Sequence, residues 1–399
     1  MDNPLATKAD LASCLVDYVD DHSFFFFSSV CKAWREAWGE RPTSTKAVTA
    51  STSVAQLSYS FRCGLGPTHS ICHETSRLGR LDLLQRGRGE GCEWNQETFS
   101  LAAQEGHLDV LRWLYANGCP QSKDACDRAA SGGQLAILQW LPTNDCKWSS
   151  HACANAAGGG HLDVLKWLRV NGSWWSWRAC SSAARGGHLD VLGWLIKNGC
   201  PCEPDACGEA AAAGQLGSLM FLRGLRYDWS GREGVEAARG GHLLVLQWLR
   251  AVGFEFTSSV FCNAARAGHL DVVKWLREKG YPWDALSCSR AAFGGHLDVL
   301  RWLRANGCPW DELSCSQAAA GGHLGILQWM RREGCPWGEM TCSSAAEGGH
   351  LDVLKWARAN GCPWDGYTVL YAAKEGHEDI VDWAVANGCD VPSVSDGDY

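Results

Sequence analysis

Residues 294–323 read GGHLDVLRWLRANGCPWDELSCSQAAAGGH, and the motif that opens this stretch returns at its end. Its two histidines, His296 and His323, mark one period of twenty-seven positions. Equivalent positions follow at the same interval from Arg80 to His377, and the residue before each of them is glycine. Strict self-similarity over a short period is typical of a solenoid, whose repeats contact only their neighbours. We therefore treat this stretch of the chain as twelve repeats.

One repeat predicts two helices. Leu297, Leu300 and Leu303 lie on one side of a helix, which Gly307 ends. The other helix, which precedes the leucine helix in each repeat and is called the first helix below, is predicted at residues 311–320 in the next repeat. It consists of small residues and is closed by glycine, and small side chains let neighbouring helices approach closely. Neither helix buries its apolar face alone, so stacked repeats must form the core. The sequence predicts an all-α fold, an α-solenoid of stacked helix-turn-helix repeats.

The composition limits the classes of function. The chain has 399 residues, 46% hydrophobic residues and a formal net charge of −8, which disfavours binding to nucleic acid phosphates. The first residues lack the basic start and apolar run of a signal peptide, and no stretch approaches the ~20 apolar residues of a membrane span. We therefore expect a cytoplasmic or nuclear protein, in which the 21 cysteines stay mostly reduced.

Tryptophan occupies two positions of the repeat. One follows the histidine position by six residues, as in Trp302, and the other precedes it by 13, as in Trp283. Together these positions hold 18 of the 22 tryptophans. Tryptophan rings stack on bases or sugars in some proteins, but a ring in nearly every repeat is better explained by packing, since each buries ~150–250 Å². We interpret these tryptophans as packing residues between repeats.

Cysteine also occupies two positions. One lies in the first helix, eight residues before the histidine position, as in Cys288, and the other lies in the loop, as in Cys308. Equivalent residues of stacked helices are ~8–10 Å apart, whereas a disulfide needs Cα atoms within ~7 Å. Neither series can be bridged along itself, and the chain has no CxxC pair that would predict a zinc site. We interpret the cysteines as small apolar residues and expect no metal and no cofactor.

Histidine fills nine of the twelve equivalent positions, and Arg80, Gln134 and Gln215 fill the others. Rings that lie one repeat apart do not converge on a metal ion, and no serine or cysteine nucleophile accompanies a distinctive His–Asp pair. A donor that bonds the neighbouring backbone at the turn between helices explains these substitutions better than catalysis does. We therefore predict no catalytic residues and a non-enzymatic protein.

Two repeats depart from the pattern. Pro142 lies within the second helix expected in one of them, and Gly217 and Gly224 lie within the second helix expected in the other. Proline in a helix interior costs ~3 kcal/mol and glycine up to ~1 kcal/mol. These repeats are candidate bends in the solenoid, and neutral drift explains them equally well.

The repeat resembles an ankyrin repeat. The order Ala-Ala, Gly-His-Leu-Asp-Val-Leu and Asn-Gly matches the core of that family, and the most similar copy is TVLYAAKEGHEDIVDWAVANGCDV at residues 368–391. The resemblance covers residues 67–391. The family period is about 33 residues, and the residues that are absent here fall where the family carries a β-hairpin finger. The resemblance therefore implies stacked short helix pairs with little or no strand, and a concave face that binds a protein partner.

A function should lie where the repeats differ. Three residues before the histidine position, on the expected exposed side of the first helix, the side chains vary from repeat to repeat. In the middle of the array they predict a partly basic patch that suits an acidic peptide or protein surface, although ordinary solvated charges explain the same residues. The candidate partner-binding residues are Trp177, Arg185, Arg239, Arg266, Arg290 and Phe293.

The segment before the array, residues 8–40, resembles an F-box. Its apolar spacing suggests three short helices, and residues 30–35 read VCKAWR, which fits the typical ending of that family. The resemblance implies a substrate receptor that docks on a Skp-type adaptor of a cullin-type ubiquitin ligase, while the repeats hold the substrate. The candidate adaptor-binding residues are Leu15, Val19, Phe24, Phe27, Val30 and Trp34.

The alternative interpretation is that the same segment only caps the first face of the array, since solenoids need capping elements. The chain would then be an interaction scaffold or adaptor with no ubiquitin-ligase role. Residues 41–66 are expected to be a linker or a degenerate capping repeat, because Val54, Leu57 and Phe61 echo a second helix in register. Residues 392–399 are polar and acidic, and we expect them to be disordered.

Overall fold

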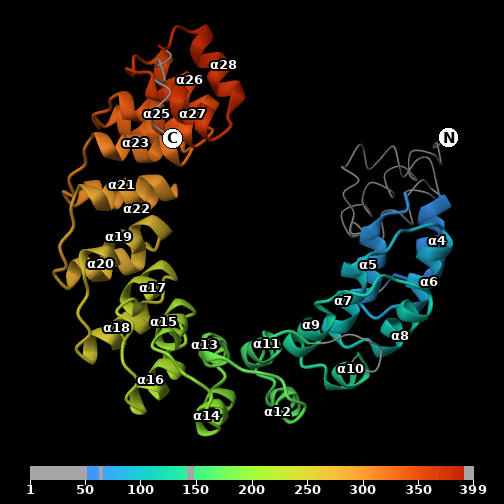
Figure 1. The fold of residues 1–399 in the computed structure, drawn as a ribbon. Helices are drawn as coiled ribbons and strands as arrows, with labels where there is room; N and C mark the ends of the chain where they lie inside the picture. Colours follow the sequence, from blue (N-terminus) through green and yellow to red (C-terminus); the bar gives the residue numbers. More distant parts are fainter. Residues whose placement is uncertain (1–51, 63–65, 142–147, 391–399) are drawn as a thin grey trace, which may run out of the picture. The chain divides into compact units, whose positions relative to one another are not determined.

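Helices of two kinds alternate along the chain. The computed structural model describes residues 52–62, 66–141 and 148–390. Over these residues every helix or strand assigned is a helix, which confirms the predicted all-α solenoid. The chain divides into two compact units, Met1–Cys202 and Glu203–Tyr399, and each unit stacks its helices pair upon pair (Figure 1).

The first helix of each repeat is rich in alanine, serine and cysteine. Within each unit it packs closely against the first helix of the next repeat, because its small side chains allow the two backbones to approach. The first helices are α5 (His69–Arg77), α7 (Gln96–Glu105), α9 (Ala125–Ser131), α11 (Ala152–Gly158), α13 (Trp177–Gly186), α15 (Asp205–Ala212), α17 (Glu233–Arg239), α19 (Ser258–Ala267), α21 (Ala285–Gly294), α23 (Glu312–Ala320), α25 (Glu339–Glu347) and α27 (Tyr367–Lys374).

The second helix of each repeat carries larger apolar residues, mostly leucine, and in ten of the twelve repeats it carries one tryptophan. It packs against its own first helix and approaches the neighbouring second helices less closely, since larger side chains lie between them. The second helices are α6 (Leu81–Gly89), α8 (Leu108–Ala116), α10 (Leu135–Trp140), α12 (Leu162–Val170), α14 (Leu189–Lys197), α16 (Leu216–Gly224), α18 (Leu243–Ala251), α20 (Leu270–Glu278), α22 (Leu297–Ala305), α24 (Leu324–Arg332), α26 (Leu351–Ala359) and α28 (Glu378–Ala386).

One further helix precedes the first repeat. α4 (Val54–Arg62) begins one repeat length before α6, packs against it and buries Leu57 completely. It therefore occupies the place of a second helix in register with the repeats. The F-box-like segment 8–40 and the tail 392–399 lie outside the described residues.

The helix boundaries follow from individual side chains. At α23 the Asp311 carboxylate accepts a hydrogen bond from the Ser314 amide (3.3 Å), and the Ser314 hydroxyl accepts one from the Asp311 amide (3.4 Å). This reciprocal capping box satisfies amides that a helix leaves without partners. At the end of α22 the Asn306 side chain donates to the Trp302 carbonyl (2.8 Å), and Gly307 takes a left-handed φ of 81°.

A few fully buried side chains form the core of each repeat. In α21 and α22 they include Ala291, Ala292, Val299, Leu300 and Leu303. A fully buried valine or leucine contributes ~1.5–3 kcal/mol. The helix faces predicted from the leucine spacing are therefore the faces that the structure buries.

Eight of the nine histidines at this position bond the backbone of the preceding repeat. The Nε2–H of His323 donates to the carbonyl of Phe293, in the last turn of α21 (3.0 Å). Gln134 replaces histidine in its repeat and makes the same bond, to the carbonyl of Gln104 (3.3 Å). These bonds confirm the prediction of a backbone-bonding donor at the turn, and they explain why glutamine is accepted there.

The glycine before the histidine position is required by the same contact. At Gly295 φ is +82°, a conformation that side chains with a Cβ rarely adopt. A Cβ on Gly295 would also lie 2.6 Å from Cε1 of His323 in the next repeat. The strict recurrence of this glycine therefore reflects both the turn and the packing of the neighbouring imidazole.

The two irregular repeats differ in how they depart from the period. α10 has six residues instead of nine and ends at Trp140, before Pro142, which lies outside the described residues. α16 keeps all nine residues, so Gly217 and Gly224 do not shorten it. The turn after α16 places Arg226 at a φ of 63°, where most repeats have glycine.

Candidate protein-binding surface

A pair of tryptophans lies in eight of the twelve repeats. The loop residue Trp175 meets Trp194 of α14 edge-on, with ring centroids 5.7 Å apart and planes inclined by 73°. Such contacts add ~0.5–1.5 kcal/mol to the burial of the rings, which here are half-buried. The prediction that these tryptophans pack is confirmed, but each pair lies within one repeat and not between repeats. The other pairs, 5.5–6.0 Å apart, are Trp94–Trp113, Trp148–Trp167, Trp229–Trp248, Trp283–Trp302, Trp310–Trp329, Trp337–Trp356 and Trp364–Trp383.

An arginine of the preceding repeat covers the loop tryptophan. The Arg169 guanidinium lies 3.9 Å from the centroid of the Trp175 ring, and its Nη1 donates to the Ser173 carbonyl (2.6 Å). A cation over an aromatic face contributes ~0.5–1 kcal/mol at exposed sites. We call this contact between consecutive repeats the joint. It lies in the loop where the ankyrin resemblance places a β-hairpin finger, and its arginine was not predicted from the sequence. Similar stacking joins Arg88 to Trp94, Arg277 to Trp283, Arg304 to Trp310, Arg331 to Trp337 and Arg358 to Trp364.

The two cysteine series meet inside the repeat. The Cys308 thiol donates to the carbonyl of Asp284, the N-cap residue of α21 (3.3 Å), and it also hydrogen-bonds the Cys288 thiol. None of the described cysteines forms a disulfide. The sequence analysis considered each series alone and therefore missed the contact between them. The loop cysteine thus fixes the residue that starts the first helix of its own repeat.

Burial keeps several of these thiols protonated, whereas the hydrogen bond with Cys288 lowers the pKa of Cys308. Desolvation raises the pKa of Cys72 and of Cys119 to about 12. The hydrogen bond with Cys308, together with burial, raises the pKa of Cys288. A protonated, buried thiol is a poor nucleophile and a poor metal ligand. The interpretation of the first-helix cysteines as small apolar residues is confirmed, since Cys72 and Cys288 are fully buried.

Two of the six predicted partner-binding residues lie on α13, in the first unit. Trp177 begins this helix and is half-buried, with the Arg178 guanidinium 5.4 Å from its ring centroid. Arg185 is exposed in the last turn of the same helix. Both side chains are therefore at the surface of the first-helix layer, as the sequence predicts, and their role in binding remains a prediction.

The other four predicted residues lie on α17, α19 and α21, in the second unit. The Arg266 guanidinium stacks on the Phe293 ring, 4.6 Å from its centroid, so the structure brings these two together. Arg239 is exposed and forms an ion pair with Glu236 (3.3 Å), which reduces the basic character of the patch. Arg290 is half-buried on α21. The six candidate adaptor-binding residues, Leu15, Val19, Phe24, Phe27, Val30 and Trp34, lie outside the described residues.

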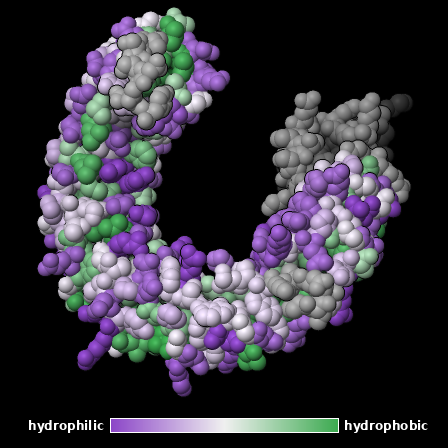
Figure 2. Space-filling view, in the orientation of Figure 1, coloured by the Kyte–Doolittle hydropathy of each residue, from purple (hydrophilic) through white to green (hydrophobic). Residues whose placement is uncertain are grey.

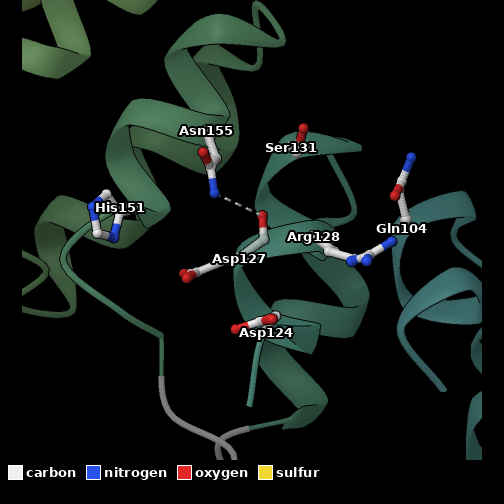
Figure 3. Close-up of a pocket in the computed structure, with 7 residues that line it drawn as sticks. All are labelled: Gln104, Asp124, Asp127, Arg128, Ser131, His151 and Asn155. Atoms are coloured by element: carbon white, nitrogen blue, oxygen red, sulfur yellow. Dashed lines mark hydrogen bonds between the residues drawn. The ribbon is translucent and has the colours of Figure 1, made fainter. Parts of the chain in front are cut away.

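The first helices α7, α9 and α11 line an open polar pocket that was not predicted from the sequence. The pocket has a volume of about 450 Å³. Its residues lie three, six, seven and ten positions before the histidine position, whereas the sequence analysis compared only the position three before it. A comparison of all exposed first-helix positions in the sequence would have identified the pocket. The lining residues are Gln104, Asp124, Asp127, Arg128, Ser131, His151 and Asn155 (Figure 3).

The charges in this pocket are unevenly balanced. Arg128 is held by Glu97 through two hydrogen bonds (3.0 and 2.9 Å). Asp127 is buried and accepts a bond from the Ser149 amide (3.0 Å), whereas Asp124 is exposed. In Figure 3 the two aspartates point away from Arg128. The pocket therefore offers the exposed Asp124 carboxylate to a binding partner, since its one arginine is already paired.

The rest of the surface is mixed in character. Figure 2 shows short hydrophobic groups between hydrophilic side chains on the visible face of the molecule. Within the described ranges, no helix has both the length and the apolar character needed to cross a membrane. The same ranges contain no group of three or more His, Cys, Asp or Glu side chains arranged to hold a metal ion.

Comparison with known protein families finds a match to part of the repeat array. A family model described as "Ankyrin repeats (many copies)" matches residues 99–141 and 261–304. These two stretches contain ankyrin repeats. The ankyrin repeat fold is a non-catalytic fold, and its presence implies a role in protein–protein interaction. The comparison with curated proteins gave no match.

Solved structures resemble this chain only distantly. The human ASB11 ankyrin repeat domain is 20% identical with a TM-score of 0.34, and the match covers 39% of this chain and 84% of that domain. The maize pentatricopeptide repeat protein PPR10 is 14% identical with a TM-score of 0.31, and the match covers 84% of this chain and 61% of PPR10. The likeness is one of helical repeat architecture alone.

Proposed function

We propose that this chain binds a protein partner through the exposed side of its first helices. One observation supports the proposal: the recurrent tryptophan, cysteine and histidine side chains are engaged in contacts within and between repeats, whereas the exposed first-helix side chains differ from repeat to repeat. Residues that recur build the framework, and residues that differ distinguish one binding surface from another. The polar pocket on α7, α9 and α11 belongs to this variable surface.

Site-specific photo-crosslinking tests the proposal. A crosslinking residue is placed at Ser131, which is exposed on α9 and lines the pocket, and a matched one at Arg112, which is exposed on the second helix α8. We expect covalent adducts with a cellular protein from position 131 and few from position 112. Adducts that form mainly from position 112 would place the binding surface on the second helices and contradict the proposal.

We further propose that the bound protein is presented to a cullin-type ubiquitin ligase through the F-box-like segment. The sequence VCKAWR at residues 30–35 supports this step. A pull-down with a purified Skp-type adaptor tests it, using the full chain against the variants Trp34→Ala and Val30→Asp. We expect the unaltered chain to bind and both variants to lose binding.

The alternative is an ankyrin repeat scaffold without a ligase role. α4 favours it, because this helix continues the period toward the amino terminus and extends the array on that side. If the unaltered chain does not bind the adaptor, the ligase proposal fails and the scaffold remains. The crosslinking experiment is independent of that outcome, since it concerns only the repeats.

A further inference from the structure

One exposed position of the first helix changes its character along the chain. It lies ten residues before the histidine position. In the first eight repeats it is polar or charged, and its residues are Ser70, Glu97, Asp124, His151, Arg178, Asp205, Arg232 and Ser259. In the last four repeats it is apolar, and its residues, which we name the apolar stripe, are Leu286, Leu313, Met340 and Tyr367.

The apolar stripe runs across four adjacent helices. Its residues stand at the N-terminal ends of α21, α23, α25 and α27, which pack side by side in this order (Figure 1). Leu286, Met340 and Tyr367 are 37%, 56% and 55% exposed, and Leu313 is half-buried. The Tyr371 ring, 5.7 Å from that of Tyr367, widens the stripe at its end. Single exposed apolar residues need no explanation, whereas a row of them on neighbouring helices marks an interaction surface.

Acidic side chains border the stripe on one side. Glu312 and Glu339 are exposed next to it, and the capping residues Asp284 and Asp311 lie at the following position outward. Among the described residues, none of these four carboxylates has an ion-pair partner. Residues 284–390 contain 14 Asp and Glu against 8 Lys and Arg, a formal net charge of −6. The surface therefore favours a partner that carries positive charge beside apolar side chains.

The spacing of the stripe indicates the conformation of that partner. Equivalent residues of packed helices repeat at ~8–10 Å. On an α-helix, residues seven apart are separated by ~10.5 Å and lie on almost the same side. On an extended strand a rise of ~10 Å corresponds to three residues, and side chains three apart point to opposite faces. A helix therefore matches the stripe, and a single strand does not.

We infer that the apolar stripe binds a basic amphipathic helix of the partner protein. This helix carries an apolar side chain at every seventh position and Lys or Arg on the side that faces the acidic border. Four contacts extend over roughly 30 Å, which corresponds to about 20 residues of helix. The inference rests on the proposed protein-binding function and adds the location and the chemical class of the bound segment.

A synthetic peptide tests the inference on the full chain. The probe is a helix of roughly 30 Å that carries four leucines at seven-residue intervals, lysine and arginine beside them, alanine and glutamine elsewhere, and a fluorophore at one end. A second peptide has the same composition with its leucines at three- and ten-residue intervals, and a third has glutamate in place of each basic residue. We expect the first peptide to bind at least about tenfold more tightly than the others, and to weaken as salt is raised.

Matched variants locate the binding on the stripe. Met340→Ser with Leu286→Ser removes two contacts, and we expect it to weaken the first peptide at least about tenfold. Met220→Ser with Leu244→Ser is the control, because these residues are 52% and 71% exposed on the second helices α16 and α18 of the same unit. We expect the control to change the affinity less than twofold. Circular dichroism of each variant verifies that the helices are retained.

Three results would overturn the inference. The first is failure of the basic heptad peptide to bind, and the second is equal loss in the stripe and control variants. The third is self-association of the chain that only the stripe variants abolish in sedimentation, since the occupant would then be a second copy. None of these results would contradict the proposed protein-binding function. That function is tested separately, by adducts from the crosslinker at position 131 in the other unit.

Discussion

The repeat of α15 and α16 and the repeat of α21 and α22 share their core leucines, although Ser218 stands where the second repeat has Val299, and they have different joints. Leu219 and Leu222 are fully buried in the first repeat, as Leu300 and Leu303 are in the second. Both second helices have nine residues. Burial of apolar surface therefore forms the helix pair even where several other recurrent residues are missing.

The joint that follows each pair is where the two repeats diverge. After α22, Arg304 lies 4.0 Å from the centroid of the next loop tryptophan, and Gly307 turns the chain at a φ of 81°. After α16, Arg223 lies 4.9 Å from the equivalent ring, and Arg226 takes the left-handed turn at a φ of 63°. The core and the joint thus contribute separately to the stability of the array. The core makes a repeat, and the joint couples it to the next one.

The largest predicted effect lies in the shared core. Leu222→Ala and Leu303→Ala should each lower the free energy of unfolding by about 2–5 kcal/mol, because each deletes a fully buried side chain and leaves a cavity. Urea denaturation of the full chain, followed by circular dichroism, measures both losses. We expect the two losses to agree within about 1 kcal/mol. A much smaller loss for Leu222→Ala would mean that the core of the irregular repeat is weaker as well.

The aromatic contacts should separate the two repeats. Trp302→Ala removes a half-buried indole together with its edge contact to Trp283, and we expect a loss of about 3 kcal/mol. Phe221→Ala removes a smaller ring, for which the described residues contain no aromatic partner, and we expect about 1–2 kcal/mol. Equal losses in the same denaturation experiment would show that the ring pair adds nothing to burial.

Substitutions at the two turns should change the free energy of unfolding in opposite directions. Arg226→Gly should stabilise the chain by about 1 kcal/mol, since glycine adopts a left-handed φ without strain, and Gly307→Ala should destabilise it by about 1–2 kcal/mol. Gly224→Ala is the control, because this residue ends α16 with open space around its Cα, and alanine should stabilise it by about 0.5–1 kcal/mol. Destabilisation by Arg226→Gly would refute the account of the turn.

The effect that is smallest at neutral pH concerns a thiol that the joint after α16 lacks, since Tyr227 stands where eight of the twelve repeats have cysteine. Burial raises the pKa of Cys119 from 9.0 to about 12. The folded chain therefore holds a proton that the unfolded chain releases, and stability should be complete below pH 9 and fall between pH 9 and pH 12. Cys119→Ala should make this fall shallower in urea denaturation at several pH values. An unchanged slope would contradict the assignment.

The repeat period of the sequence predicts much of this architecture. Helix faces, turn glycines and the backbone bond of the histidine all follow from spacing along one helix or one turn, as His323 and Gly295 illustrate. The meeting of Cys288 with Cys308 did not follow, because it depends on how the loop folds back over the first helix. The stacking of Arg304 on Trp310 was missed for the same reason, since a repeat pattern gives the distance along the array and not the side on which a loop returns.

The residues of the proposed binding surface follow from the sequence only in part. Arg266 and Phe293 were identified from one exposed position and do lie together, at 4.6 Å. The polar pocket and the apolar stripe occupy other positions of the same helices, so comparing a single position along the array left them out. The printed sequence shows which equivalent residues change character between repeats. Packing decides which of them are exposed, as the half-buried Leu313 shows.

The hydrogen bond that eight of the nine repeat histidines make to the preceding repeat has a consequence for how such a chain can grow. A segment of one full period inserted in phase presents a new imidazole to the repeat before it and a new carbonyl to the repeat after it. Both junctions are then restored with no compensating substitution. Unequal recombination between identical gene segments can therefore lengthen or shorten the protein in whole steps, and natural selection can alter its reach without redesigning its interior.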